Sequence, residues 1–147
     1  MTTAQAVVEM PPVIAIVDDD PAVCNSLKFS LELEGLEVRT FAGGADLLSA
    51  RDIEICQCFV VDQKMPGMSG LELIGKLRDR QIAAPAILII SQPSAALSAR
   101  AASAQVPIVE KPLLGNALLD RIREALRADN ARHNIDDLRK SGPSRFA

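Results

Sequence analysis

The sequence has few aromatic residues and no apolar run long enough to cross a membrane. Only 3% of its 147 residues are aromatic, and Trp and Tyr are missing altogether. The core must therefore be aliphatic, and the exposed rings on which RNA-binding surfaces stack bases are not available. The longest apolar run, Ala83 to Ile90, is interrupted by Pro85 and is far shorter than the roughly 20 residues that span a bilayer.

Dense basic runs and a cysteine framework are also missing. The net charge is −3, which argues against direct binding of nucleic acid. Residues 1–12 have neither a basic start nor a long apolar stretch, so we expect no secretory signal and a cytoplasmic protein. The three cysteines, Cys24, Cys56 and Cys58, are an odd number, and they lack a second ligand pair for zinc. We interpret them as small buried apolar residues.

Short apolar runs that stop at a polar residue alternate with amphipathic stretches along the chain. The runs are typical of strands buried on both faces, and the stretches between them carry apolar residues at helical spacing. We predict strands at 13–17, 36–41, 58–61, 86–90 and 107–109. We predict helices from Pro21 to a stop at Gly35, at 43–51, 69–80 and 94–104, and from Leu114 to about Ala128.

Two helix starts have clear signals. Asp20 precedes Pro21, which fits an N-cap followed by proline at the first helical position. Ser69 and Glu72 have the spacing of a capping box, in which each side chain bonds the other residue's backbone N–H.

Five alternations of strand and helix predict an α/β fold, a doubly wound parallel sheet with helices on both faces. We expect a flexible leader at 1–12, one domain at 13–128 and a polar tail at 129–147. A further hypothesis is that the tail extends the last helix and packs on a second copy of the chain.

Four of the five predicted strands end in a polar group, and in a parallel sheet these ends meet at one edge. The groups are Asp18 with Asp19, Asp62, Ser91 and Lys111. Three nearby carboxylates repel one another unless a cation offsets their charge, and Mg²⁺ prefers such oxygen ligands. Asp62 is then the candidate nucleophile that forms an aspartyl-phosphate, with Lys111 and Ser91 contacting the phosphoryl oxygens. Taken singly, these residues are ordinary helix caps, turn residues or solvated charges; their joint pattern carries the prediction.

Four motifs carry these polar residues: Ile16-Val17-Asp18-Asp19-Asp20-Pro21, Val61-Asp62-Gln63-Lys64-Met65-Pro66-Gly67-Met68-Ser69-Gly70-Leu71-Glu72-Leu73, Ile90-Ser91 and Glu110-Lys111-Pro112. With them the chain resembles the receiver domain of bacterial two-component response regulators over about residues 12–128, and its motifs look most like those of nitrogen-fixation-type transcriptional regulators. The resemblance implies a flavodoxin-like (βα)5 receiver fold with strand order 2-1-3-4-5. It also implies a stand-alone response regulator, because no DNA-binding domain follows in the sequence.

Carried over residue by residue, the resemblance makes Asp62 the phospho-acceptor and Lys111 and Ser91 its partners. Asp19 would bind Mg²⁺ directly, Asp18 would act largely through water, and the backbone carbonyl of Lys64 would complete the metal shell. The phosphoryl donor would be a phosphohistidine on a sensor histidine kinase or a phosphotransfer protein. Such a module signals through protein contacts and turns over no external substrate, so we do not expect an enzyme.

Three features depart from the family pattern. Ile108 stands where the family has its switch aromatic, Gln92 and Pro93 follow Ser91 in place of a small residue, and 103–106 lack the usual Gly-Ala-x-aromatic stretch. All three fall on the face that the family uses for output and dimerisation. We therefore predict that the phosphorylation chemistry is kept while the output surface is unusual.

Several alternatives compete with this interpretation. A degenerate receiver would act as a binding or dimerisation partner without phosphorylation. A Mg²⁺-dependent phosphohydrolase would want an acid two residues after the nucleophile, where this chain has Lys64. A flavin carrier would need a phosphate-binding loop after the first strand, where the aspartates would repel a phosphate. A homodimer through the fourth and fifth helices, the fifth strand or the tail is a further hypothesis.

Overall fold

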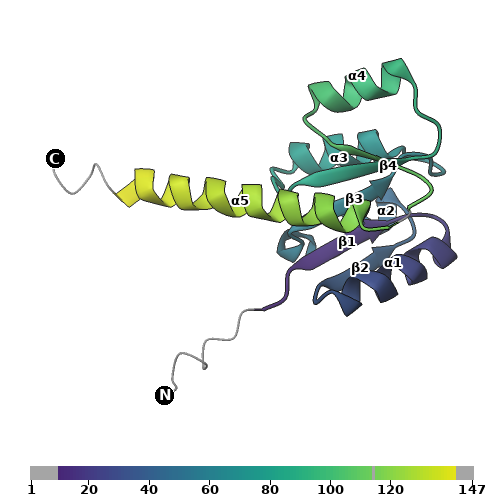
Figure 1. The fold of residues 1–147 in the computed structure, drawn as a ribbon. Coiled ribbons are helices and arrows are strands. Elements are labelled where there is room, and N and C mark those ends of the chain that lie inside the picture. The colour runs from purple at the N-terminus through teal and green to yellow at the C-terminus, as the bar shows by residue number, and fades with distance from the viewer. Residues whose placement is uncertain (1–9, 114, 142–147) are drawn as a thin grey trace.

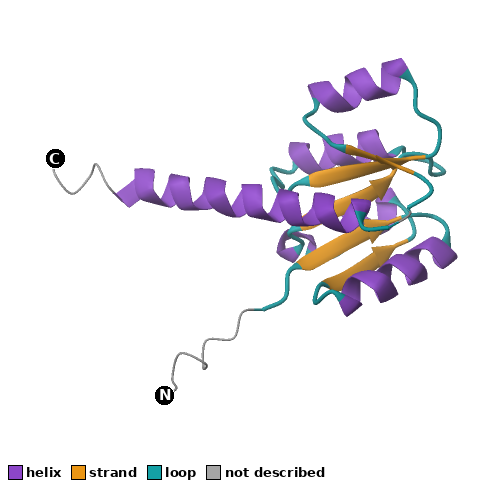
Figure 2. Ribbon diagram, in the orientation of Figure 1, coloured by secondary structure: helices purple, strands orange, loops and turns teal. Residues whose placement is uncertain are grey.

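The computed structural model describes residues 10–113 and 115–141, and these form a parallel sheet covered by helices on both faces (Figures 1 and 2). The strands are β1 (Val13–Val17), β2 (Glu37–Phe41), β3 (Cys58–Asp62), β4 (Ala86–Ile90) and β5 (Ile108–Glu110). The helices are α1 (Pro21–Leu33), α2 (Gly44–Leu48), α3 (Gly70–Asp79), α4 (Ala95–Ser103) and α5 (Ala117–Ser141), with a short 3₁₀ turn η2 (Ile53–Ile55).

The strand order is β2-β1-β3-β4-β5, and every neighbouring pair is parallel. The predicted doubly wound fold and its strand order are therefore confirmed. β3 lies at the centre, between β1 and β4. Its register aligns Val61 with Val17 on β1 and Asp62 with Ile89 on β4, so the carboxyl ends of the three central strands reach one edge together.

Each face of the sheet has its own aliphatic core. Ile14, Val60 and Ile87 point to the face that α1 and α5 cover, where they meet Leu27, Leu31 and Ile122 in one buried cluster. Their neighbours along the strands point to the opposite face, which α2, α3 and α4 cover. Because both faces are covered, the strands are apolar throughout, and this is why they read as continuous apolar runs in the sequence.

α1 and α3 begin where the two capping signals in the sequence place them. The Asp20 side chain accepts a hydrogen bond from the Ala22 N–H at 2.9 Å and caps α1. The capping box is present at the start of α3: the Glu72 N–H donates to Ser69 Oγ at 3.2 Å, and the Ser69 N–H donates to Glu72 Oε1 at 3.1 Å. Gly35 follows α1 with φ +88°, a conformation that costs glycine little.

Some predicted boundaries are wrong. The second helix is shorter than predicted, and η2, which was not predicted, follows it. The predicted bounds of the last helix, Leu114 to about Ala128, are also wrong: α5 begins at Ala117 and continues to Ser141, as the further hypothesis that the tail extends this helix expects. Part of the predicted tail is thus helical; Leu114, residues 1–9 and residues 142–147 lie outside the described residues.

The extension of α5 leaves the body of the molecule beyond the amino ends of the strands (Figure 1). Its residues 131–135 are all exposed, and Ile135 keeps 50% of its surface accessible. Asp129 forms an ion pair with Arg132 three residues further along the helix, and such pairs stabilise a helix that is polar all round. Within the described part of the chain, no helix is apolar and long enough to cross a membrane.

Candidate functional site

The central strand β3 is one residue longer than the predicted strand at 58–61, so Asp62 is its last residue. Its neighbours Val60 and Val61 are fully buried, which brings the polar residue to the edge of the sheet on a rigid support. Asp62 itself is only 5% exposed, and a buried acid of this kind is costly unless charged or polar partners surround it.

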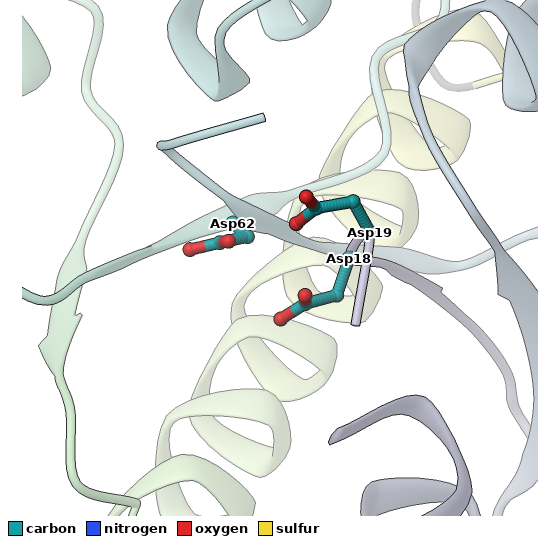
Figure 3. Close-up of side chains that lie close together, drawn as sticks. All are labelled: Asp18, Asp19 and Asp62. Carbon is teal, nitrogen blue, oxygen red and sulfur yellow. The ribbon is translucent and has the colours of Figure 1, made fainter. Parts of the chain in front are cut away.

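Two further carboxylates lie beside it. Ligand oxygens of Asp18, Asp19 and Asp62 lie within 4.8 Å of one another, as Figure 3 shows for the three side chains. Asp18 is 3% exposed and accepts a hydrogen bond from the Asp20 N–H at Oδ1, whereas Asp19 is exposed. The other Asp18 oxygen, Oδ2, is buried, and among the described side chains it has no hydrogen-bond partner.

Lys111 brings the counter-charge from the end of β5. Its Nζ lies 3.5 Å from Asp18 Oδ2 and 3.5 Å from Asp62 Oδ1, and the side chain is 26% exposed. The Lys111 N–H donates to the Ile90 carbonyl at 2.7 Å, which continues the ladder of β4 and β5 by one residue. The peptide bond to Pro112 is cis.

The pKa values of the central pair reflect burial and these charges. Burial raises the pKa of Asp62, the negative charge of Asp18 raises it further, and Lys111 lowers it by less, so the pKa stands above the ordinary value. Burial lowers the pKa of Lys111, but the charges of Asp62 and Asp18 together raise it by more. Lys111 therefore stays cationic, but its single charge does not offset the effects of burial and of Asp18 on the pKa of Asp62.

Ser91 and Lys64 lie at the same edge of the sheet. Ser91 is exposed and follows β4 directly, two residues beyond the Ile89 that pairs with Asp62. It lines a hollow together with Gln63, Lys64, Ile90, Gln92 and Leu97. The structure thus brings Asp18, Asp19, Asp62 and Lys111 into one cluster, and it places Ser91 and Lys64 beside that cluster.

Sequence reasoning missed two residues that shape the site, Gln63 and Gly70. A Cβ on Gly70 would stand 2.7 Å from the Asp62 carbonyl oxygen and 2.7 Å from Leu88 Cδ1, so only glycine allows α3 to begin this close to β3. Gln63 bonds to that helix start through its backbone and its side chain. Gly70 in the first turn of the predicted helix was a usable signal, because glycine destabilises a helix and is favoured where the backbone must approach another group closely.

Comparison with known families decides what kind of domain this is. The sequence model described as "Response regulator receiver domain" matches residues 14–123, which include all of the candidate site residues. The chain belongs to this receiver family. Response regulator receivers act in two-component signalling, where they accept phosphoryl groups from histidine kinases and phosphotransfer proteins.

Two curated relatives of the receiver are named as transcriptional regulatory proteins. The C4-dicarboxylate transport regulator DctR of Rhodobacter capsulatus is 33% identical over 122 residues, which cover 81% of this chain and 62% of the relative. FixJ of Azorhizobium caulinodans is 31% identical over 135 residues, covering 91% of this chain and 64% of the relative. The receiver therefore spans less than two thirds of the length of these relatives.

Solved structures of similar chains have the same fold. A CheY-like receiver from Methanospirillum hungatei JF-1 is 30% identical with a TM-score of 0.77, covering 83% of this chain and 98% of that one. The structure titled FixJ-N is also 30% identical, with a TM-score of 0.72 and coverage of 81% and 96%. The resemblance to receivers, including those of the nitrogen-fixation type, is confirmed.

The predicted output face is lightly packed in this receiver. Ala101 is the buried residue of α4 and Leu97 is half-buried, while the other residues of the helix are exposed. Ile108, which stands at the position of the family's aromatic, is half-buried on β5. These observations describe the surface on which the predicted departures fall, and what they do to signalling stays a prediction.

Proposed function

We propose that this receiver takes a phosphoryl group on Asp62, in a Mg²⁺-dependent reaction, from a phosphohistidine of a sensor histidine kinase or a phosphotransfer protein. It then signals through contacts with other proteins. The observation that carries the proposal is the cluster itself: a buried Asp62 with Lys111 Nζ at 3.5 Å and two more carboxylates beside it. Phosphoryl transfer needs mainly positioning and charge neutralisation, and this cluster supplies both.

Asp62, Lys111 and Ser91 have different roles in the proposed phosphoryl transfer. An Asp62 carboxylate oxygen attacks phosphorus, a P–O bond forms, and the P–N bond to the donor histidine breaks with its electron pair left on the imidazole. Lys111 Nζ, already 3.5 Å from Asp62 Oδ1, turns to a phosphoryl oxygen as negative charge arrives there. The Ser91 hydroxyl donates a hydrogen bond to another phosphoryl oxygen. Asp62 must be ionised to attack, and Lys111 opposes the burial that raises its pKa.

The residues present fit a magnesium ion. The buried Asp18 Oδ2 has no hydrogen-bond partner among the described side chains, and its ion pair with Lys111 leaves the three carboxylates with an excess of negative charge. We propose that Asp18, Asp19, Asp62 and the Lys64 carbonyl oxygen hold Mg²⁺, either directly or through water. When bound, the ion neutralises charge on the phosphoryl group and on the acids.

A groove beside Lys111 fits the docking of the phosphoryl donor. It lies between α1 and the segment after β5, has a volume of about 810 Å³, and continues to Lys111 itself. Its apolar walls include Val23, Leu27 and Leu113. We propose that a helix carrying the phosphohistidine packs here. Ser26→Arg, on the groove wall, should then slow transfer from a phosphorylated kinase at least tenfold and leave phosphorylation by acetyl phosphate unchanged.

The test of the acceptor is the mass of the intact protein after incubation with acetyl phosphate, with and without Mg²⁺. Wild type should gain one phosphoryl group only when Mg²⁺ is present, and Asp62→Ala should gain none. Because some receivers ignore small donors, a negative result leads to the same assay with a phosphorylated histidine kinase. Failure with both donors would reject the proposed acceptor role.

The second candidate is a receiver that works as a binding or dimerisation partner without phosphorylation. Ile108 in place of an aromatic ring and the lightly packed α4 favour it. The intact-protein mass separates the two, because a phosphorylation-independent partner takes up no phosphoryl group from either donor, and light scattering then shows whether the protein is a dimer. Dimerisation through α4, β5 and α5 only on phosphorylation would contradict the prediction of an unusual output surface. The stand-alone nature of the receiver stays a prediction.

A further inference from the structure

Gln63, the residue after Asp62, is held from three directions. Its backbone N–H donates to the Ile89 carbonyl of β4 at 2.9 Å, and its own carbonyl accepts from the Gly70 N–H at 3.0 Å. Its side-chain Oε1 accepts from the Leu71 N–H at 2.9 Å. One residue thus joins the end of the central strand to the neighbouring strand and to the first turn of α3.

The first turn of α3, which Gln63 binds, lies in close contact with the carboxyl end of β3. The absent Cβ of Gly70 would come within 3.0 Å of the Gln63 Cα as well as close to the Asp62 carbonyl. The first N–H groups of a helix have no partner inside the helix, so Gly70 and Leu71 take theirs from Gln63. The loop that begins at residue 63 and contains Lys64 is therefore anchored at both of its ends on α3.

We infer that the Gln63 side chain is a positioning residue of the magnesium site: it holds the peptide between Asp62 and Lys64 in the orientation that metal binding requires. The inference rests on the proposed function, which places a metal on the Asp62 carboxylate and the Lys64 carbonyl. Gln63 stands between these two ligands in the sequence. Hydrogen bonds that orient metal ligands are worth about 10- to 100-fold in affinity or activity when they are removed.

A purely structural role would make Gln63 one more cap of α3, and Ser69 offers the matched control. Ser69 caps the same helix through its bond with the Glu72 N–H, at 3.2 Å. It lies at the far end of the loop from Asp62 in the sequence. Loss of either cap weakens the start of α3, but only loss of the Gln63 acceptor releases the peptide between the two proposed ligands.

The experiment compares the wild-type chain with its Gln63→Leu and Ser69→Ala variants. Mg²⁺ dissociation constants come from amide chemical shifts during magnesium titrations, and phosphorylation rates come from acetyl phosphate at several Mg²⁺ concentrations. Gln63→Leu should raise the dissociation constant about tenfold. It should also slow phosphorylation most at low Mg²⁺, with recovery toward the wild-type rate at saturating Mg²⁺. Ser69→Ala should keep the dissociation constant within about twofold of wild type.

Equal magnesium affinities for the two variants would overturn the inference and leave Gln63 as a helix cap. If Gln63→Leu does not fold, Gln63→Met, of the same length but lacking the amide, takes its place. Magnesium binding by the wild type tests the proposed metal site separately. Wild type that binds no Mg²⁺ would reject the proposed metal site and the inference with it, whereas binding by wild type with unchanged affinity in the Gln63 variants would reject the inference alone.

Discussion

Neutralising the proposed phospho-acceptor should make the metal-free protein more stable. Asp62 is 5% exposed, faces Asp18 and Asp19 at oxygen distances of up to 4.8 Å, and has Lys111 at 3.5 Å. At an effective dielectric constant of about 20, each repulsion amounts to at least about 3.5 kcal/mol and the attraction to about 5 kcal/mol. Exposure of Asp19 screens one repulsion and burial of Asp62 adds a penalty, so the ionised carboxylate costs roughly 1 to 2 kcal/mol.

Asp62→Asn, which keeps the size of the side chain, should therefore raise the free energy of unfolding by about that amount at pH 7.5 in EDTA, or Tm by about 3 to 8 °C. This difference in stability between the variant and wild type should decrease as the pH falls. The folded-state pKa of Asp62 is raised, so wild type carries the penalty above that pKa and loses it as the pH falls through it and the carboxyl is protonated. The advantage of the variant should vanish below about pH 4.

Urea unfolding of both proteins across this pH range measures the effect. Asp52→Asn is the control, because Asp52 is exposed and its side chain makes no cap bond; its effect should stay within about 0.5 kcal/mol. Mg²⁺ should reverse the order, since an ion at 100 times its dissociation constant adds about 2.7 kcal/mol to wild type. An Asp62→Asn variant that is no more stable than wild type in EDTA would refute the reasoning.

Three further outcomes are expected. Lys111→Gln should slow phosphoryl uptake at saturating Mg²⁺ by about 100-fold, measured as the initial rate with acetyl phosphate, since it removes the cation 3.5 Å from Asp62; a rate within twofold of wild type would contradict its role. Gly70→Ala should cost about 1 to 3 kcal/mol in urea unfolding because its Cβ meets backbone, whereas Gly75→Ala, with nothing within 4 Å, should be neutral or stabilising; equal effects would contradict the close approach. Truncation after Asn130 should change the free energy of unfolding by less than about 0.5 kcal/mol, because residues 131–135 are exposed, and a larger loss would show that the extension contributes to the fold.

The length of α5 shows where local sequence patterns mislead. The change to polar residues at Asp129 predicts the end of the helix, because a polar segment buries no face against the sheet. The helix continues nevertheless, and opposite charges three residues apart, such as Asp129 and Arg132, pair along it. A loss of amphipathicity marked the end of packing against the body and did not mark the end of the helix.

The sequence by itself determined the order of the elements, the helix starts at Pro21 and Gly70, and the site residues that follow strands. These follow from local causes: apolar periodicity, side-chain caps and the rule that parallel strands bring their carboxyl ends to one edge. Tertiary structure decided the rest. Only packing buries Asp18 and Asp62 while it leaves Asp19 exposed, sets Lys111 at 3.5 Å from two acids, and presses Gly70 against Asp62. These distances depend on contacts between residues far apart in the chain, which no local pattern encodes.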